Sequence, residues 1–280
     1  MKETRVLFAS DIHYCEMPWF GLTRDEKAER FCSAIKNEYE ANPFDALLLL
    51  GDYSLDHWVW HTKGTYLTEG ISNTKLFTDR YLNSLLPEGV TLKMIAGNHE
   101  QYGETLFTEL TGHKRRDHLV LENTLFILTD TFGGDLDPTE HSDGTYIGAN
   151  AYDITELINT YPDKNVILCA HWFDMDKETE AFKELLRRET RIKCLVCGHN
   201  HRSVILSTGE ENGNLPILCT GHFSYSGEKD PKSCLFGYRE ITVTDSAIVS
   251  KYISPANTYT IDGITYTNEY TEQDKIIIPI

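Results

Sequence analysis

The sequence lacks a long hydrophobic run. The longest apolar runs, such as Ala46–Leu50, have only five residues, whereas a helix that crosses a membrane needs about 20 apolar residues. The N-terminal residues also lack the apolar core of about 7–15 residues that a secretory signal carries. We therefore expect no membrane partner and no secretory leader, and we predict a cytoplasmic protein.

Basic residues are scarce. Lys and Arg total 26 against 43 Asp and Glu, which gives a net charge of −17. Proteins bind long nucleic acids by neutralising phosphates with Lys and Arg, and the one basic cluster, Lys114-Arg115-Arg116, is short and is predicted to be a solvated loop. We expect no long nucleic acid as a partner. A small phosphate ester can still bind if a local cation such as a metal ion overrides the repulsive field.

The cysteines do not have the pattern of a disulfide framework. The chain has seven cysteines, an odd number, and only one C-x-x-C pair, Cys194 and Cys197. That pair lies within the apolar stretch Ile192–Cys197, which has the pattern of a buried strand. We therefore predict buried, reduced thiols and no zinc site built from thiolates.

Short apolar runs bounded by turn residues dominate the first two thirds of the chain and alternate with helical patterns. The strands are expected at residues 6–9, 46–50, 91–96, 119–121, 125–128, 166–170 and 192–197. The helices are expected at residues 23–41, 73–86, 151–161 and 176–189, and the first of them opens with the capping box Thr23-x-x-Glu26.

The last third, about residues 203–280, contains short strand patterns without helices between them. Asp262-Gly263 within it is a hairpin signal. With no linker and no repeat, these patterns predict one α/β domain over residues 1–280, built on two packed, mixed β-sheets flanked by helices, with a β-rich C-terminal part.

Polar side chains follow five of the expected strands at the point where each strand ends. They are Asp11 with His13, Asp52, Asn98 with His99 and Glu100, His171, and His199 with His201. Because ligands of open α/β sheets bind outside the carboxyl ends of the strands, we expect these residues to converge although they span about 190 positions.

The residue types in this set constrain its chemistry. Two aspartates, an asparagine and up to five histidines, with no thiolate, suit manganese, iron or zinc. They are too many for one tetrahedral ion but enough for two ions that share a bridging carboxylate. Two metals about 3.5–4 Å apart are a common device for hydrolysing phosphate esters.

In order, the motifs D-x-H, G-D, G-N-H-E, H and G-H-x-H, from Asp11 to His201, resemble those of the calcineurin-like metallophosphoesterase superfamily. The resemblance implies a four-layer α/β/β/α sandwich. It also implies a phosphoric ester hydrolase with two divalent or mixed-valence ions of manganese, iron or zinc, in which a metal-bridging hydroxide attacks the ester.

The resemblance further implies a role for each motif residue. The ligands of the first metal would be Asp11, His13 and His201, those of the second Asn98, His171 and His199, and the bridge Asp52. His99 would contact the phosphoryl group and help to protonate the leaving oxygen, so that His99 and Asp52 are the expected catalytic residues. Glu100 and Asp56 would orient ligands, although the acid that commonly lies three positions after the G-D aspartate is here Leu55.

Three further residues are candidates for substrate contact. His57 and Trp58 lie just past Asp52 and either stack on a nucleobase or belong to a packing patch, while His222 follows a late strand and is a candidate for the site rim.

The expected substrate is a small phosphate ester such as a nucleotide or cyclic nucleotide. The alternatives are a protein phosphatase or nuclease of the same superfamily, or a metal-binding scaffold without catalysis. Monoester or diester specificity, the metals and the oligomeric state stay open.

Overall fold

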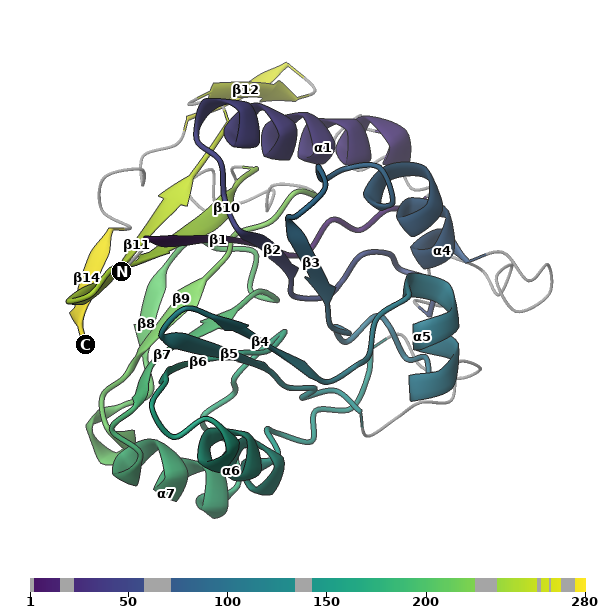
Figure 1. The fold of residues 1–280 in the computed structure, drawn as a ribbon. Coiled ribbons are helices and arrows are strands. Elements are labelled where there is room, and N and C mark those ends of the chain that lie inside the picture. Colours follow the sequence, from purple (N-terminus) through teal and green to yellow (C-terminus); the bar gives the residue numbers. More distant parts are fainter. Residues whose placement is uncertain are drawn as a thin grey trace.

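The computed structural model describes residues 3–15, 23–57, 72–133, 143–224, 236–255, 258–261, 263–267 and 275–280 (Figure 1). Two six-stranded sheets form its centre, and helices cover their outer faces.

The first sheet has the order β14-β11-β10-β1-β2-β3. Its strands are β1 (Thr4–Ala9), β2 (Ala46–Leu49), β3 (Thr91–Met94), β10 (Tyr238–Val243), β11 (Ala247–Ile253) and β14 (Ile276–Pro279). Strands β1, β2 and β3 run parallel, whereas β10 is antiparallel to β1, and β11 pairs antiparallel with both β10 and β14. The sheet is therefore mixed and joins the first strand of the chain to its last third.

The second sheet has the order β4-β5-β6-β7-β9-β8. Its strands are β4 (Asp117–Leu121), β5 (Thr124–Leu128), β6 (Asn165–Cys169), β7 (Ile192–Cys197), β8 (Ile205–Ser207) and β9 (Pro216–Cys219). Strands β5, β6, β7 and β9 are parallel, and the two edge strands are antiparallel to their neighbours. The carboxyl ends of β5, β6 and β7 therefore lie along one edge.

Helices and a separate hairpin complete the fold. The α-helices are α1 (Arg24–Ala41), α4 (Asn73–Phe77), α5 (Glu104–Thr111), α6 (Ala151–Thr160) and α7 (Glu180–Arg188). The π-helical stretch η1 (Thr78–Leu82) continues α4, and the 3₁₀ turn η2 (Glu210–Asn212) precedes β9. Strand β12 (Thr258–Ile261) pairs with β13 (Ile264–Thr267) in a hairpin around Gly263, as the Asp262-Gly263 pair predicts.

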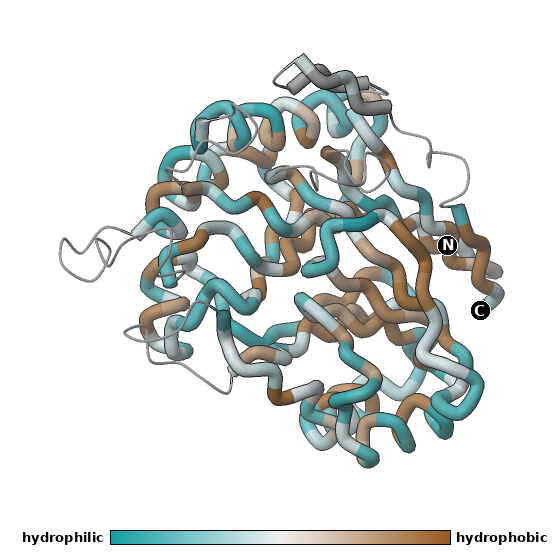
Figure 2. The backbone as a smooth tube through the Cα atoms, turned by 180° about the vertical axis from the view of Figure 1, so that it is seen from behind, coloured by the Kyte–Doolittle hydropathy of each residue, from teal (hydrophilic) through white to brown (hydrophobic). Residues whose placement is uncertain are grey.

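Three apolar cores separate four layers. One lies between the first sheet and α1, α4 and α5, one between the two sheets, and one between the second sheet and α6 and α7. Alternate residues of β1 serve different cores, since Leu7 and Ala9 face the helices while Val6 and Phe8 face the second sheet. The strands in the middle of the molecule are accordingly the most hydrophobic segments (Figure 2). The predicted α/β/β/α sandwich is confirmed.

Local signals place most element boundaries, with two exceptions. Thr23 and Glu26 form the predicted capping box at the start of α1. Helix α7, however, begins at Glu180 and not at residue 176, because the side chain of Thr179 accepts a hydrogen bond from the backbone N–H of Phe182 and caps the helix there. The helix expected over 73–86 is α-helical only to Phe77 and continues as the π-helical η1 to Leu82, so the expectation is wrong for residues 83–86.

The burial expected for the cysteine pair is confirmed, but the exposure expected for the basic cluster is only partly right. Cys194 and Cys197 are fully buried in β7, as predicted. The expected solvated loop at 114–116 is wrong for Arg115, which is only 2% exposed, because its guanidinium pairs with Asp130 inside the protein. Across the described ranges, no helix is both long and apolar enough to cross a membrane.

Candidate metal centre

The polar residues that follow the strands meet where the carboxyl ends of both sheets come together. Asp11 and His13 follow β1, Asp52 follows β2, and Asn98 with His99 follows β3, while from the second sheet His171 follows β6 and His199 with His201 follows β7. Side chains from these loops line one pocket of about 510 Å³. The convergence expected from the strand pattern is therefore present.

Backbone strain is concentrated at this centre. Seven described residues other than glycine have a positive φ, and five of them are Asp11, His13, Asp52, His199 and His201, with φ between 47° and 68°. A left-handed conformation costs a residue with a side chain about 1–3 kcal/mol and persists only where its surroundings enforce it. The fold thus holds these side chains in directions that an unstrained backbone would not provide.

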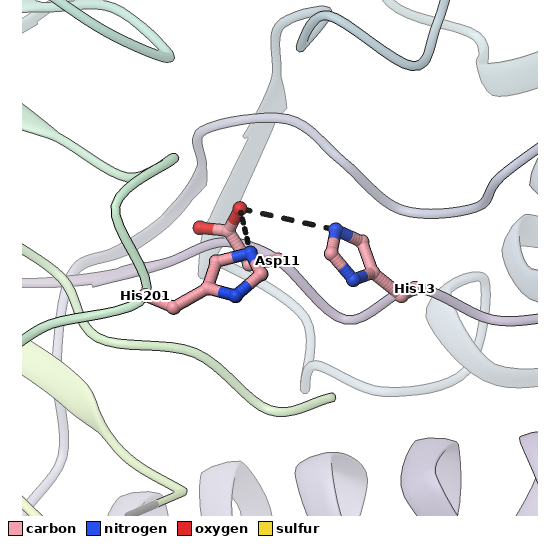
Figure 3. Close-up of side chains that lie close together, drawn as sticks. All are labelled: Asp11, His13 and His201. Carbon is pink, nitrogen blue, oxygen red and sulfur yellow. Dashed lines mark ion pairs between the residues drawn. The ribbon is translucent and has the colours of Figure 1, made fainter. Parts of the chain in front are cut away.

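One group of side chains consists of Asp11, His13 and His201 (Figure 3). Oδ1 of Asp11 lies 3.3 Å from Nε2 of His201 and 4.0 Å from Nε2 of His13. Its other oxygen, Oδ2, accepts a hydrogen bond from the backbone N–H of His199 at 3.0 Å. Burial lowers the pKa of His13 to about 4, so this imidazole is neutral at pH 7 and has a lone pair to offer.

A second group contains Asp52, His171 and His199, and Asp52 also belongs to a third with His13 and His99. Oδ2 of Asp52 lies 3.2 Å from Nε2 of His171, 3.4 Å from Nε2 of His13 and 3.7 Å from Nε2 of His99. The carboxylate therefore lies between the histidines that follow β1, β3 and β6.

The imidazole of His171 has a defined orientation. Its Nδ1 lies 2.6 Å from the carbonyl oxygen of Leu50, which can only accept, so Nδ1 carries the proton and Nε2 faces the centre. Burial lowers the pKa of His171, but the charge and hydrogen bond of Asp52, the charge of Asp11 and the hydrogen bond to Leu50 together raise that pKa to about 9. A positive charge is thus stabilised here, as expected beside a buried carboxylate.

Asn98 and His199 complete this side of the centre. Oδ1 of Asn98 lies 2.9 Å from Nε2 of His171 and 2.9 Å from Nδ1 of His199. Burial, followed by the charge of His171, lowers the pKa of His199 to about 4. An amide oxygen and two imidazole nitrogens therefore point at one small volume.

Glu100 organises the backbone around Asp52. Its buried carboxylate accepts backbone hydrogen bonds from Asp52 and Gly97 at Oε2 (2.7 and 2.9 Å) and from Tyr53 and Ser54 at Oε1 (2.9 and 3.2 Å). It thereby ties the loop after β2 to the loop after β3. Gly97 must remain a glycine, because a Cβ there would overlap Oδ1 of Asp52.

Asp56 lies elsewhere. The hydrogen bonds that the structure shows for its carboxylate come from Ser72, Asn73, Thr74 and Tyr102, three of which are at the N-terminus of α4. The side chain thus holds α4 against the loop after β2, and these contacts include none of the candidate ligand side chains.

Of the three candidates for substrate contact, two are buried and one lies outside the described residues. His57 is 1% exposed, and its Nδ1 lies 3.0 Å both from the backbone nitrogen of Gln101 and from the carbonyl oxygen of His99, so it packs behind the G-N-H-E loop. His222 is also 1% exposed, with its ring centroid 5.5 Å from that of His201. Trp58 lies outside the described residues.

The pocket has walls that the motifs do not supply. Phe132, Asp143, Tyr146 and Lys177 line it together with the histidines. Tyr146 is held in place because its hydroxyl donates to Oε1 of Glu178 at 2.5 Å and accepts from the backbone N–H of Asp174 at 2.8 Å. Phe132, four residues past β5, could have been found by the strand-end rule, whereas the other three lie on loops without a motif.

Comparison with known proteins agrees with this geometry. A sequence model of the family described as calcineurin-like phosphoesterase matches residues 4–203. The chain belongs to the calcineurin-like phosphoesterase family. This match confirms the resemblance carried by the motifs between Asp11 and His201. A search of curated protein sequences found no match.

Solved structures share the fold at low identity. A dimetal phosphatase from Danio rerio is 11% identical, with 95% of this chain and 99% of that chain covered and a TM-score of 0.66. A purple acid phosphatase from seeds of yellow lupin (Lupinus luteus) is 14% identical, with 98% of this chain and 55% of that chain covered and a TM-score of 0.57. GAP50, described as the anchor in the inner membrane complex of Plasmodium, is 12% identical, with 96% and 89% covered and a TM-score of 0.51. At these identities the likeness shows the fold.

Proposed function

We propose that this family member hydrolyses small phosphate esters with two metal ions held by ligand groups that share Asp52. The position of Asp52 carries the proposal, because its carboxylate belongs to one group of possible ligands with His171 and His199 and to another with His13 and His99. A carboxylate with two oxygens, placed between two sets of imidazoles, suits a bridge between two ions.

The donor set fits divalent ions. Oδ1 of Asp11 is buried and accepts no hydrogen bond from the described residues, so a lone pair is available where His13 and His201 converge. His13 and His199 are neutral at pH 7 because burial lowers their pKa values to about 4, and neutral imidazole is the ligating form. His171, whose pKa is raised to about 9, would give up the proton on Nε2 to an ion that binds there. Mixed oxygen and nitrogen donors favour manganese, iron or zinc over calcium or magnesium.

The chain's residues then divide the work. Asp11, His13 and His201 would hold one ion, Asn98, His171 and His199 would hold the other, and Asp52 would serve both groups. When bound, two such ions lower the pKa of a water and neutralise charge on the phosphoryl oxygens. His99 lines the pocket with Nε2 3.7 Å from Oδ2 of Asp52, close enough to contact a phosphoryl group placed there and to give a proton to the leaving oxygen.

The pocket suits a compact substrate. Its volume of about 510 Å³ accommodates a nucleotide-sized ester. Phe132 and Tyr146 provide an aromatic wall for the leaving group, and Lys177 places a cation at the rim. The net charge of −17 disfavours long polyanions, so a nucleotide or cyclic nucleotide is preferred to a nuclease substrate.

We also propose that residues 1–280 act as a single domain. Strand β1, at the start of the chain, pairs with β10 from the last third, and the core between the sheets contains side chains of both. No boundary with few contacts separates the described segments that form these sheets.

The decisive experiment is a turnover panel on the purified full chain with Mn²⁺. It compares p-nitrophenyl phosphate, its bis ester, cyclic nucleotides, a phosphoserine peptide and a 20-mer DNA. We expect hydrolysis of at least one small ester and about two metal equivalents by elemental analysis. Preferential hydrolysis of the peptide or the 20-mer would favour a protein phosphatase or a nuclease, and metal binding without any turnover would favour a scaffold.

Two variants test the assigned roles. His99→Asn should lower kcat while the metal content holds, because His99 is assigned to the phosphoryl group. Loss of metal in this variant would contradict that assignment. Asp245→Asn, at an exposed turn outside the pocket, is the matched control and should behave like wild type.

A further inference from the structure

Asp143 and Gly144 lie directly against the G-N-H-E loop. The backbone N–H of Gly144 donates to the carbonyl oxygen of Asn98 at 2.7 Å. A Cβ on Gly144 would lie 3.0 Å from that oxygen, so the approach is close enough to favour glycine. The backbone contact sets Asp143 beside Asn98 and His99.

One oxygen of Asp143 reaches both of these side chains. Oδ1 of Asp143 accepts a hydrogen bond from Nδ2 of Asn98 at 3.0 Å and lies 3.5 Å from Nδ1 of His99. The same atom therefore contacts a proposed metal ligand and the proposed proton donor.

For Asn98 the contact decides which end of the amide faces the centre. An asparagine side chain can present either its oxygen or its NH₂ group in a given direction, and its partners select the orientation. A carboxylate can only accept, so Asp143 holds the NH₂ group on its own side. Oδ1 of Asn98 is thereby left facing His171 and His199, at 2.9 Å from each ring nitrogen.

For His99 the contact turns the ring. With Nδ1 toward Asp143, Nε2 is the nitrogen on the side of Asp52. This is the orientation in which Nε2 can reach a phosphoryl group in the pocket.

Asp143 belongs to none of the five sequence motifs. Asp56, the acid nearest in sequence to the position where the family commonly has one, is engaged with the N-terminus of α4. Asp143 lies 45 residues beyond Asn98 in a stretch without regular structure.

We propose that Asp143 is a positioning residue that orients the Asn98 amide and the His99 imidazole for metal and phosphate. The proposal rests on the proposed function, since it assigns a purpose to the orientation of these two side chains. Asp143 itself is 60% exposed, so its removal leaves no cavity in a core.

The test compares Asp143→Ala, Asp143→Asn and a control, Asp79→Ala. Asparagine keeps an acceptor oxygen at the place of Oδ1 and so separates orientation from charge. Asp79 is an exposed carboxylate of η1 paired with Lys75, and its loss changes the net charge by the same amount as Asp143→Ala. Mn²⁺ affinity of the metal-stripped proteins is measured by titration calorimetry, and kcat and KM are measured with the best small ester.

We expect Asp143→Ala to weaken Mn²⁺ binding and to lower kcat, each by about 10–100-fold, as is usual when the partner of a metal ligand is removed. Asp143→Asn should recover most of the Mn²⁺ affinity, and Asp79→Ala should match wild type. Equal affinity and kcat in Asp143→Ala and wild type would overturn the proposal, as would an asparagine variant as impaired as the alanine variant. A wild-type protein that binds no Mn²⁺ and hydrolyses no ester would instead refute the proposed function.

Discussion

Two adjacent arginines, Arg115 and Arg116, should respond very differently to the same substitution. Arg115 is 2% exposed and forms a two-point ion pair with Asp130, from Nε at 2.8 Å and from Nη2 at 3.2 Å. Its Nη1 also donates to the carbonyl oxygens of Glu100 and Tyr102, at 2.6 and 2.7 Å. The guanidinium thus joins the loop that follows β3 to the loop that follows β5.

Replacement by methionine keeps the volume of the stem but removes every donor. Arg115→Met leaves the carboxylate of Asp130, which is 4% exposed, without its cation. Breaking a buried pair by removing one partner costs about 3–5 kcal/mol, because the remaining charge stays buried without compensation. Arg116 pairs with Asp153 at 2.7 Å, but its side chain is 54% exposed, and exposed pairs contribute only about 0.2–1 kcal/mol.

Urea unfolding at pH 7 measures the difference. We expect Arg115→Met to lower the free energy of unfolding by about 3–5 kcal/mol and Arg116→Met by less than about 1 kcal/mol, with similar m-values. The double variant Arg115→Met/Asp130→Asn should lose less than the sum of the two single changes, because no unpaired charge remains. Equal losses in Arg115→Met and Arg116→Met, or strict additivity in the double variant, would refute the reasoning.

Three further expectations concern single carboxylates. Asp52→Asn should lower the bound metal well below two equivalents and nearly abolish turnover, as elemental analysis and the ester assay would show, because the bridging charge serves both ions. Asp56→Ala should reduce the free energy of unfolding by more than about 1 kcal/mol in urea, since backbone N–H groups at the start of α4 lose their acceptor, while Mn²⁺ binding holds. For Asp25, burial raises the pKa, but hydrogen bonds from Tyr81 and Tyr14 outweigh it and lower the pKa below its usual value of 3.8. The native state then binds fewer protons than the unfolded chain, so Asp25 contributes stability above pH 3.8 that is lost as the pH falls through the lowered pKa. The stability gap between wild type and Asp25→Asn should therefore narrow below pH 3.8, and a gap that widens on acidification would contradict this.

Local patterns were sufficient for the parts of the molecule that depend on a few neighbouring residues. Five-residue apolar runs such as Ala46–Leu50 predict buried strands, and Thr23 with Glu26 predicts the start of α1, because burial and capping act over a few positions. Once the strands are placed, the carboxyl ends of parallel strands must share an edge. The convergence of Asp11, Asp52 and His199 could therefore be anticipated without coordinates.

Other features depend on contacts between segments far apart in the chain. Nothing local distinguishes Arg115 from Arg116, and their burial is decided by where Asp130 lies after the second sheet has formed. Asp143 reaches Asn98 across 45 positions only because the two sheets bring the loops after β3 and β5 together. The sequence motifs indicate which chemistry a residue type can support. The packing of the two sheets determines which groups each side chain contacts, and only the tertiary structure specifies that packing.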